Sequence, residues 1–383
     1  MLNAAGIAKQ GSDTIFSWWA RYQSAKAEGR DAVNGTIGAL LEDDGNLAIN
    51  KAVDAAVRVA PEVEIAAYAP LAGLPAFLDL SKTLALGDAR SIFEESGFHL
   101  ASTATPGGSG ALYLAANNLL ERGQTALLRD RHWGPYKGFL ENNGIDFVTW
   151  PLLPPNGHAV HPYFAADEFE DQLDQLCSKQ DKIMVWLNDP AHNPTGLSLG
   201  VEGRAACLSS FVTSALNNAE IGHTLLIDSA YSLYAEEPHA WADTILDALN
   251  SGMPWPENLL ICIAISLSKS HTIYGLRTGA LVSIHPEKEV IDRISTVMSV
   301  TGRQTWSAAP RVAQYCVSEM HSTEEGGIAW GEERDRLKKL LDDRRNNLKV
   351  ECKKLNVDLN PTMDGFFAWI ETEDPETFAE SCA

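Results

Sequence analysis

The sequence has few basic residues for its length. Thirty lysines and arginines stand against 51 aspartates and glutamates in 383 residues, which gives a formal net charge of −21. Proteins that bind nucleic acid usually present a basic face, so this balance argues against nucleic-acid binding as a general activity. An anionic ligand must instead be captured locally, by the few basic residues that lie among apolar residues or glycines.

Long apolar runs and paired cysteines are also lacking. The longest apolar run, at about 259–267, is too short to span a bilayer, and residues 1–19 contain Lys9 and Asp13 without the apolar stretch of a secretory signal. The six cysteines form no C-x-x-C pair and no metal-ligand spacing with the histidines. We therefore expect reduced thiols, no metal, no membrane association and a cytoplasmic location.

The order of secondary-structure patterns predicts an α/β fold. From about residue 100, strand and helix patterns alternate, which is typical of a mainly parallel sheet with helices on both faces. The expected strands are 125–128, 146–152, 182–187, 224–228, 259–265 and 280–284. The expected helices are 14–28, 49–60, 111–121, 135–143, 168–178, 201–218 and 239–250, and the part from 286 to 353 is mostly helical.

The stretch 266–279 concentrates polar chemistry directly after an apolar strand. Lys269 would lie at the carboxyl end of that strand, where open α/β sheets bind their ligands. Ser266, Ser268 and Arg277 add hydroxyl donors and a guanidinium fork, which suit a phosphate dianion. A solvated lysine in a polar loop is the alternative interpretation.

A glycine-rich segment, Thr-Pro-Gly-Gly-Ser-Gly-Ala at 105–111, leads into an apolar helix. Gly108 and Ser109 could offer N–H groups and a positive helix end to an anion. A sharp turn without a ligand explains the segment equally well. It lacks the lysine of a nucleoside-triphosphate loop, so a nucleoside triphosphatase is not expected.

Polar residues follow two further strands. Asn193, in Asn-Pro-Thr-Gly, could donate to a ligand oxygen, although this is also ordinary turn chemistry. Asp228 ends an apolar strand and is followed by Tyr231. A buried carboxylate needs a partner. Asp228 could pair with a protonated ring nitrogen of a ligand, or it could cap a helix.

Three more side chains have two interpretations each. Trp133 follows a strand and could stack on a planar cofactor or pack in the core. Arg303 could bind a carboxylate or lie on the surface. Tyr68, in a loop, could act in a site or cover apolar surface.

Taken in order, these elements resemble the aspartate and aromatic amino-acid aminotransferases, which are class I pyridoxal-phosphate enzymes. The similarity extends from about Asn34 to Trp369 and depends most on Ser-x-Ser-Lys…Gly-x-Arg-x-Gly at 266–279 and on Asn-Pro-Thr-Gly. It implies pyridoxal-phosphate fold type I, with a large cofactor-binding domain at 46–330 and a smaller α/β domain formed by 1–45 and 331–383. It also implies a homodimer with shared active sites.

The resemblance assigns a role to each element. Lys269 would bind pyridoxal 5'-phosphate covalently and move the substrate proton, with Asp228 on the pyridine nitrogen. Tyr231 and Asn193 would contact the ring's phenolic oxygen, and Trp133 would stack on the ring. The phosphate would be held by Gly108, Ser109, Ser266, Ser268 and Arg277, with Tyr68 reaching over from the second subunit. The substrate would meet Gly38, Trp133, Asn193 and, from the partner, Arg303.

Two positions depart from the family pattern. Tyr136 stands where the family has a histidine three residues after the stacking tryptophan. The family's arginine for the substrate α-carboxylate follows the segment that resembles 365–369, and here no lysine or arginine occurs after Lys354. Either the small domain is shortened or another group binds the α-carboxylate, and we favour the shortened domain.

The expected function is transfer of an amino group between an L-amino acid, aspartate- or glutamate-like or aromatic, and a 2-oxo acid. A lyase or decarboxylase that uses the same cofactor and fold is the alternative. A non-catalytic binding module is the third possibility. The presence of the complete set of lysine, aspartate and arginine argues against it.

Overall fold

The computed structural model describes residues 1–2, 6–7, 14–35, 38–155 and 161–381. The contacts between residues divide the chain into two compact units, Met1–Leu47 and Ala48–Ala383. The first unit contains helix α2 (Thr14–Ala27) and an isolated bridge between Leu41 and Leu47. Within α2, the guanidinium of Arg21 lies 4.2 Å from the centre of the Trp18 ring.

The second unit is built on a seven-stranded sheet with the order β1-β7-β6-β5-β4-β2-β3. The strands are β1 (His99–Pro106), β2 (Thr125–Arg129), β3 (Asp146–Trp150), β4 (Lys182–Asn188), β5 (Gly222–Asp228), β6 (Leu259–Ser266) and β7 (Thr278–His285). Only β7 pairs antiparallel with its neighbours, β1 and β6. The prediction of a mainly parallel sheet is confirmed.

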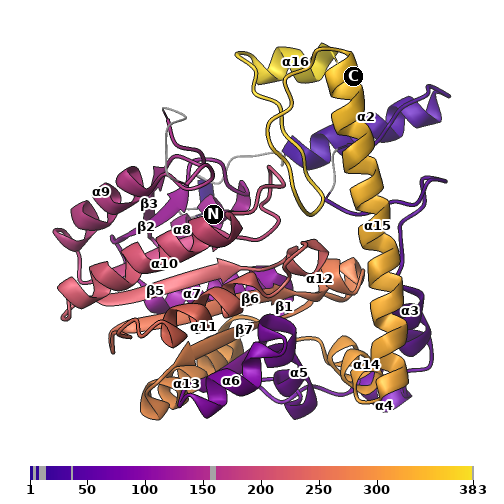
Figure 1. The fold of residues 1–383 in the computed structure, drawn as a ribbon. Coiled ribbons are helices and arrows are strands. Elements are labelled where there is room, and N and C mark those ends of the chain that lie inside the picture. The colour runs from indigo at the N-terminus through magenta and orange to yellow at the C-terminus, as the bar shows by residue number, and fades with distance from the viewer. Residues whose placement is uncertain (3–5, 8–13, 36–37, 156–160, 382–383) are drawn as a thin grey trace. The chain divides into compact units, whose positions relative to one another are not determined.

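Helices cover both faces of this sheet (Figure 1). One face packs against α5 (Pro75–Leu86), α6 (Ala89–Glu95), α9 (Ala166–Cys177), α10 (Gly200–Asn217) and α11 (Ala240–Asn250). The other packs against α7 (Gly107–Leu119), α8 (Pro135–Asn142) and α13 (Lys288–Thr305). Because side chains alternate across a strand, Ile261 and Ile263 belong to the first core and Cys262 and Ala264 to the second.

The remaining helices complete the second unit. They are α3 (Lys51–Arg58), α4 (Glu62–Ala66), α12 (Leu267–Ser270), α14 (Arg311–His321), α15 (Glu324–Lys354) and α16 (Pro375–Ser381), with short 3₁₀ turns at Ser232–Tyr234 and Tyr274–Leu276. The long helix α15 contacts α3 and α14, and the chain turns back after it (Figure 1). The predicted domain boundary at residue 330 therefore falls inside a continuous helix, and the two-domain division stays a prediction.

Two expectations from the sequence need correction. Strand β1 was not expected, because Ser102, Thr103 and Thr105 interrupt its apolar pattern; its conformation depends on the antiparallel pairing with β7. Helix α7 begins at Gly107 rather than at 111, so the glycines form its first turn instead of a preceding loop.

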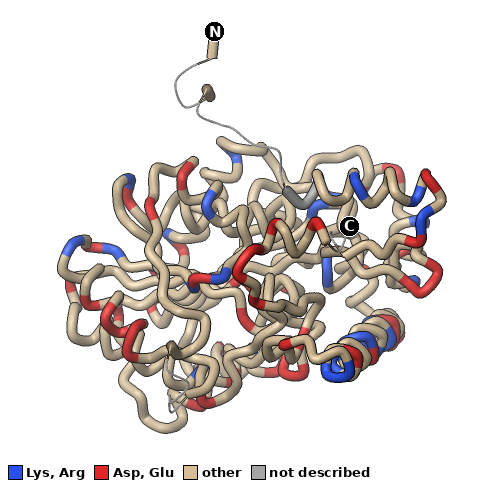
Figure 2. The backbone as a smooth tube through the Cα atoms, turned by 90° about the horizontal axis from the view of Figure 1, so that it is seen from above, with Lys and Arg blue, Asp and Glu red and all other residues tan. Residues whose placement is uncertain are grey.

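Charged positions of both signs are interspersed along the backbone (Figure 2). In α15 most of them form pairs one turn apart, such as Lys338 with Asp342 at 2.7 Å and Lys339 with Asp343 at 2.7 Å. Ion pairs one turn apart on a helix contribute little stability each, about 0.3–0.5 kcal/mol. Among the described residues, no helix has the length and apolarity needed to cross a membrane.

Candidate active site

The lysine singled out in the sequence lies where β6 ends. Lys269 is in the one-turn helix α12, and its amine lies 4.8 Å from the ring centre of Tyr274 and 5.6 Å from that of Tyr231. Burial, and secondly the positive charge of Arg277, lower the pKa of Lys269 to about 8, although Asp228 acts in the opposite direction. A larger fraction of this amine is therefore neutral near pH 7 than for an ordinary lysine.

Asp228 ends β5, the strand beside β6, and only 5% of its surface is exposed. Its carboxyl group accepts a hydrogen bond from the Tyr136 hydroxyl at 2.6 Å and one from the backbone N–H of Ala230 at 3.1 Å. Burial raises the pKa of Asp228 to about 6 in spite of both donors. The departure at Tyr136 thus places a phenol on this carboxylate.

Asn193 and Tyr231 lie together near the lysine. The side-chain amide of Asn193 is 3.4 Å from the Tyr231 hydroxyl, and its backbone N–H donates to Asn188 at 2.5 Å. Burial raises the pKa of Tyr231, so the phenol stays protonated and can donate a hydrogen bond. Trp133 is part-buried and meets Tyr136 edge to face, with ring centres 5.6 Å apart.

The glycines at the start of α7 allow Arg277 to approach the helix end. A Cβ atom on Gly107 would lie 2.5 Å from the Arg277 guanidinium, and one on Gly279 would lie 2.5 Å from the Gly107 carbonyl carbon. Arg277 also donates to the Ser268 hydroxyl at 2.8 Å. The first turn of α7, with Gly108 and Ser109, is thereby brought beside a guanidinium and the hydroxyl of Ser268, and Gly108 also lies beside Ser266. Such a set of donors suits a phosphate.

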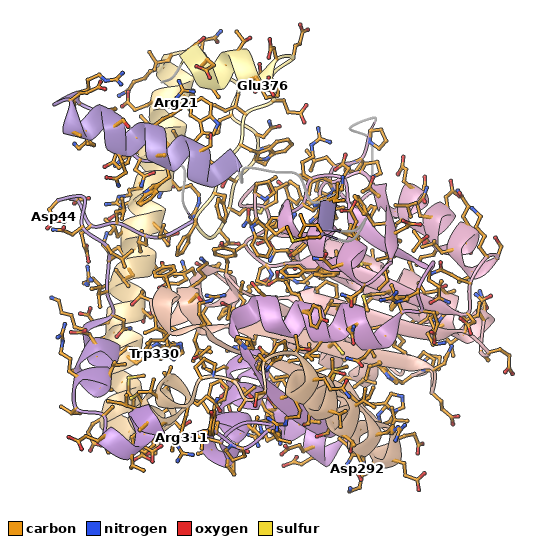
Figure 3. The ribbon with its side chains drawn as sticks, turned by 180° about the vertical axis from the view of Figure 1, so that it is seen from behind. Arg21, Asp44, Asp292, Arg311, Trp330 and Glu376 are labelled. Atoms are coloured by element: carbon orange, nitrogen blue, oxygen red, sulfur yellow. The ribbon has the colours of Figure 1, made fainter. Side chains whose placement is uncertain are left out.

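Two predicted residues lie outside this group, and a third belongs to the first unit. Tyr68 is 86% exposed, in a loop that is fastened by Arg311, which donates to the Tyr68 carbonyl at 3.1 Å and to Glu64 at 2.7 Å (Figure 3). Arg303 is exposed near the end of α13 and donates to the Ser307 hydroxyl. Gly38 belongs to the first unit, so its place relative to Lys269 stays a prediction.

Two features of the site were missed. Tyr274, whose ring lies under the lysine amine, follows Lys269 by five residues, so its position within the motif was an available signal. Phe366 and Phe367 meet Tyr231 edge to face at 5.3 and 5.1 Å from a segment more than 130 residues away. No local pattern indicates that second contact.

The site has no metal-type donor set within the residues that the structure covers: no group of three or more histidine, cysteine, aspartate or glutamate side chains is placed to hold an ion. The five described cysteines are all free thiols, and Cys382 lies outside the described residues.

Residues 30–382 match the family model for aminotransferases of class I and II. The mitochondrial aspartate aminotransferase of Schizosaccharomyces pombe is 26% identical over 296 residues, which cover 75% of this chain but only 62% of that protein. The aromatic-amino-acid aminotransferase of Paracoccus denitrificans is 26% identical over 356 residues, 91% of this chain and 83% of that protein.

Solved structures have the same fold. An aminotransferase from Anaerococcus prevotii superimposes with a TM-score of 0.90 at 26% identity, covering 100% of this chain and 90% of that one. The aromatic-amino-acid aminotransferase of Burkholderia pseudomallei, covalently bound to pyridoxal phosphate, superimposes with a TM-score of 0.73 at 23% identity, covering 94% and 85%. The family model spans almost the whole chain, including every element of the Lys269 site. The chain therefore belongs to the class I and II aminotransferase family.

Proposed function

We propose that this protein is a pyridoxal-phosphate-dependent aminotransferase that moves an amino group between an L-amino acid and a 2-oxo acid. The observation that carries the proposal is the buried amine of Lys269, which is near enough to both Asp228 and Arg277 for their charges to act on it, with Arg277 in the donor cradle. An amine, a carboxylate and a phosphate cradle in one site match the three parts of the cofactor: aldehyde, ring nitrogen and phosphate.

The donor set fits the cofactor. Gly108, Ser109, Ser266, Ser268 and Arg277 would hold the phosphate, because they combine a helix N-terminus, hydroxyls and a guanidinium. Asp228 would hold a proton on the ring nitrogen, since a buried carboxylate is stabilised by a cationic partner. Tyr231 and Asn193 would donate to the ring's phenolic oxygen, and Trp133 would stack on the ring.

Within this arrangement Lys269 has two tasks. Its amine would hold the cofactor covalently and, when substrate has displaced it, would move a proton to and from the substrate α-carbon. When bound, the cofactor would supply an electron-withdrawing ring that stabilises negative charge on that carbon. The neighbouring Arg277 and the burial of the amine support both tasks, because a partly neutral lysine is a better nucleophile and base.

The experiment is an amino-transfer assay with L-glutamate, L-aspartate or an aromatic amino acid as donor and a 2-oxo acid as acceptor. Lys269→Ala should lose turnover, whereas Lys288→Ala, which changes an exposed lysine that pairs with Asp292, should keep it. Full activity of Lys269→Ala would contradict the proposal. Release of pyruvate or ammonia from one amino acid without an acceptor would favour the lyase alternative.

The pKa of Lys269 adds a pH dependence that does not require turnover. Only the neutral amine attacks an aldehyde, so the rate of cofactor capture by cofactor-free protein should rise about tenfold per pH unit below about pH 8 and level off above it. Stopped-flow absorbance would measure this rate. A rate that keeps rising up to pH 10 would show that the pKa of the Lys269 amine is not lowered in solution.

A homodimer with shared sites belongs to the same proposal. The exposed positions of Tyr68 and Arg303 support it, because both side chains are available to a second copy. Mixing Lys269→Ala chains with Arg303→Ala chains should restore activity, since the hybrid would contain one site with both residues. Failure of the mixture to regain activity, with both variants folded and dimeric, would contradict the shared site. A cytoplasmic location stays a prediction.

A further inference from the structure

A second buried group of side chains lies directly after Lys269. It consists of Ser270, His271, His321 and Trp330, and we call it the histidine cluster. His271 is fully buried, and its backbone N–H closes α12 by donating to the Leu267 carbonyl at 3.1 Å. The cluster therefore adjoins the turn that carries the reactive amine, although the roles proposed above do not use it.

Both ring nitrogens of His271 have partners. Nδ1 lies 2.8 Å from the Ser270 hydroxyl, and Nε2 lies 3.2 Å from Nε2 of His321. The His271 ring stacks on the Trp330 indole, with ring centres 4.9 Å apart and planes at 21°, while His321 meets the same indole edge on at 4.7 Å. Stacking on the indole thus fixes the plane of the His271 imidazole, and the two hydrogen bonds fix how the ring is turned within that plane.

The two imidazoles are neutral near pH 7. Burial, the neighbouring His321 and the Arg334 guanidinium, which lies 5.1 Å from the Trp330 ring centre, all lower the pKa of His271. Burial lowers the pKa of His321 to about 4. In the contact between the two Nε2 atoms, one nitrogen must donate a hydrogen and the other must accept it. Two neutral rings can meet this condition, whereas two protonated rings cannot.

The cluster joins the lysine turn to two helices from distant parts of the sequence. Trp330, on α15, donates from its indole N–H to the Ser270 carbonyl at 3.2 Å (Figure 3). Its own carbonyl accepts from the side chain of Asn50, the N-cap residue of α3, at 3.1 Å. The backbone N–H of Asn50 in turn donates to the Thr272 hydroxyl at 2.7 Å. Residues on both sides of His271 are therefore tied to α3 and α15.

Packing alone does not account for this choice of residues. The buried imidazole of His271 must keep its hydrogen bonds, because an unpaired buried polar group is costly. Aliphatic or phenyl side chains would fill the same space without that requirement. What the imidazole adds is a directed hydrogen bond to Ser270, the residue next to Lys269.

We propose that His271 is a positioning residue for Lys269, which acts through Ser270 and the α12 turn and is itself held in place by His321 and Trp330. The proposal rests on the proposed role of Lys269. The cluster keeps the turn in the one orientation that buries the amine over the rings of Tyr274 and Tyr231. Without it, the turn would rotate more freely and the amine would spend more time in water.

The test uses cofactor-free protein and measures the acylation of Lys269 against pH by mass spectrometry. The midpoint of this profile is the pKa of the amine, which burial lowers to about 8. His271→Phe keeps an aromatic ring against Trp330 but removes both hydrogen bonds. Its midpoint should rise on the order of one unit, because a more hydrated amine is more easily protonated. The matching fall in the neutral fraction at pH 7 is about tenfold.

Two further variants separate positioning from packing. His271→Asn can still reach the Ser270 hydroxyl and should restore the midpoint towards that of the unchanged protein. His223→Phe is the control, because His223 is also buried, lies 3.1 Å from a serine hydroxyl and packs on Phe211 at 5.3 Å, but it is at the start of β5. This control should lose stability without moving the Lys269 midpoint.

The outcomes are distinct. An unchanged midpoint in folded His271→Phe would overturn the proposal, as would an equal shift in His223→Phe. If His271→Phe does not fold, His321→Leu removes one hydrogen bond from the part-buried side of the cluster and should produce a smaller shift in the same direction. The measurement involves no turnover, so a failure of amino transfer would count against the proposed function alone.

Discussion

Replacing Tyr136 by phenylalanine should change the acidity of Asp228. The Tyr136 hydroxyl donates to the buried carboxylate at 2.6 Å, and this donation lowers the pKa that burial raises to about 6. A hydrogen bond to a charged group contributes about 1.5–3 kcal/mol. Since 1.36 kcal/mol corresponds to one pKa unit, the pKa of Asp228 in Tyr136→Phe should rise by about one to two units, to roughly 7–8.

The sign of the effect on stability follows from the direction of this shift. The pKa of Asp228 in the folded protein lies above the ordinary value of 3.8. Its contribution to the free energy of unfolding is therefore fully present below about pH 4 and is lost as the pH rises through about 6. In Tyr136→Phe the loss should continue to about pH 7–8. Between pH 5 and pH 8 it should amount to about 1 kcal/mol in the unchanged protein and about 3 kcal/mol in the variant.

Urea unfolding of cofactor-free protein at the two pH values measures this difference. Asp228→Asn, alone and combined with Tyr136→Phe, supplies the background from all other titrating groups, and subtracting it isolates the Asp228 contribution. Equal Asp228-dependent losses with and without the Tyr136 hydroxyl would refute the reasoning. A larger loss in Tyr136→Phe would show that this phenol, at the family's histidine position, keeps the carboxylate ionised at neutral pH.

Two further predictions concern the phosphate cradle. Gly279→Ala should destabilise the protein by about 1–3 kcal/mol in urea unfolding, because the added Cβ would lie 2.5 Å from backbone atoms. Gly275→Ala is the control and should be close to neutral, since its added Cβ would meet no atom within 4 Å. Equal effects of the two substitutions would contradict the close packing at Gly279. Arg277→Lys should weaken cofactor binding about tenfold or more in a fluorescence titration, because an ammonium cannot replace the guanidinium fork. Arg293→Lys, at an exposed position of α13, is the control, and equal affinities would contradict a phosphate contact by Arg277.

The sheet shows which elements the local sequence could predict. Strand β6 was readable because all eight of its residues are buried and most are apolar, as expected when helices cover both faces. Strand β1 was not, since its small polar residues acquire strand geometry only by pairing with β7. The start of α7 was misplaced because glycines are typical of turns, whereas here their lack of side chains admits Arg277.

The candidate site divides in the same way. Lys269, Asp228 and Asn193 were identified because each lies at or shortly after the end of a strand, and the carboxyl ends of parallel strands meet at one edge of the sheet. The contact of Phe366 and Phe367 with Tyr231 and the histidine cluster behind Lys269 were not identified. Both features join segments that are 50 or more residues apart in the sequence. The local sequence of one segment does not indicate which other segment it will contact.

The sequence by itself determined the family, the alternation of strand and helix, and the residues able to anchor a phosphate and an aldehyde, because these depend on residue type and local spacing. Only the tertiary structure decided the acidity of those residues. Burial brings the pKa of Lys269 to about 8 and that of Asp228 to about 6. The phenol of Tyr136 reaches Asp228 from 92 residues away, and Trp330 reaches the lysine turn at Ser270 from 60 residues away. Desolvation and hydrogen-bond partners exist only once the chain has folded.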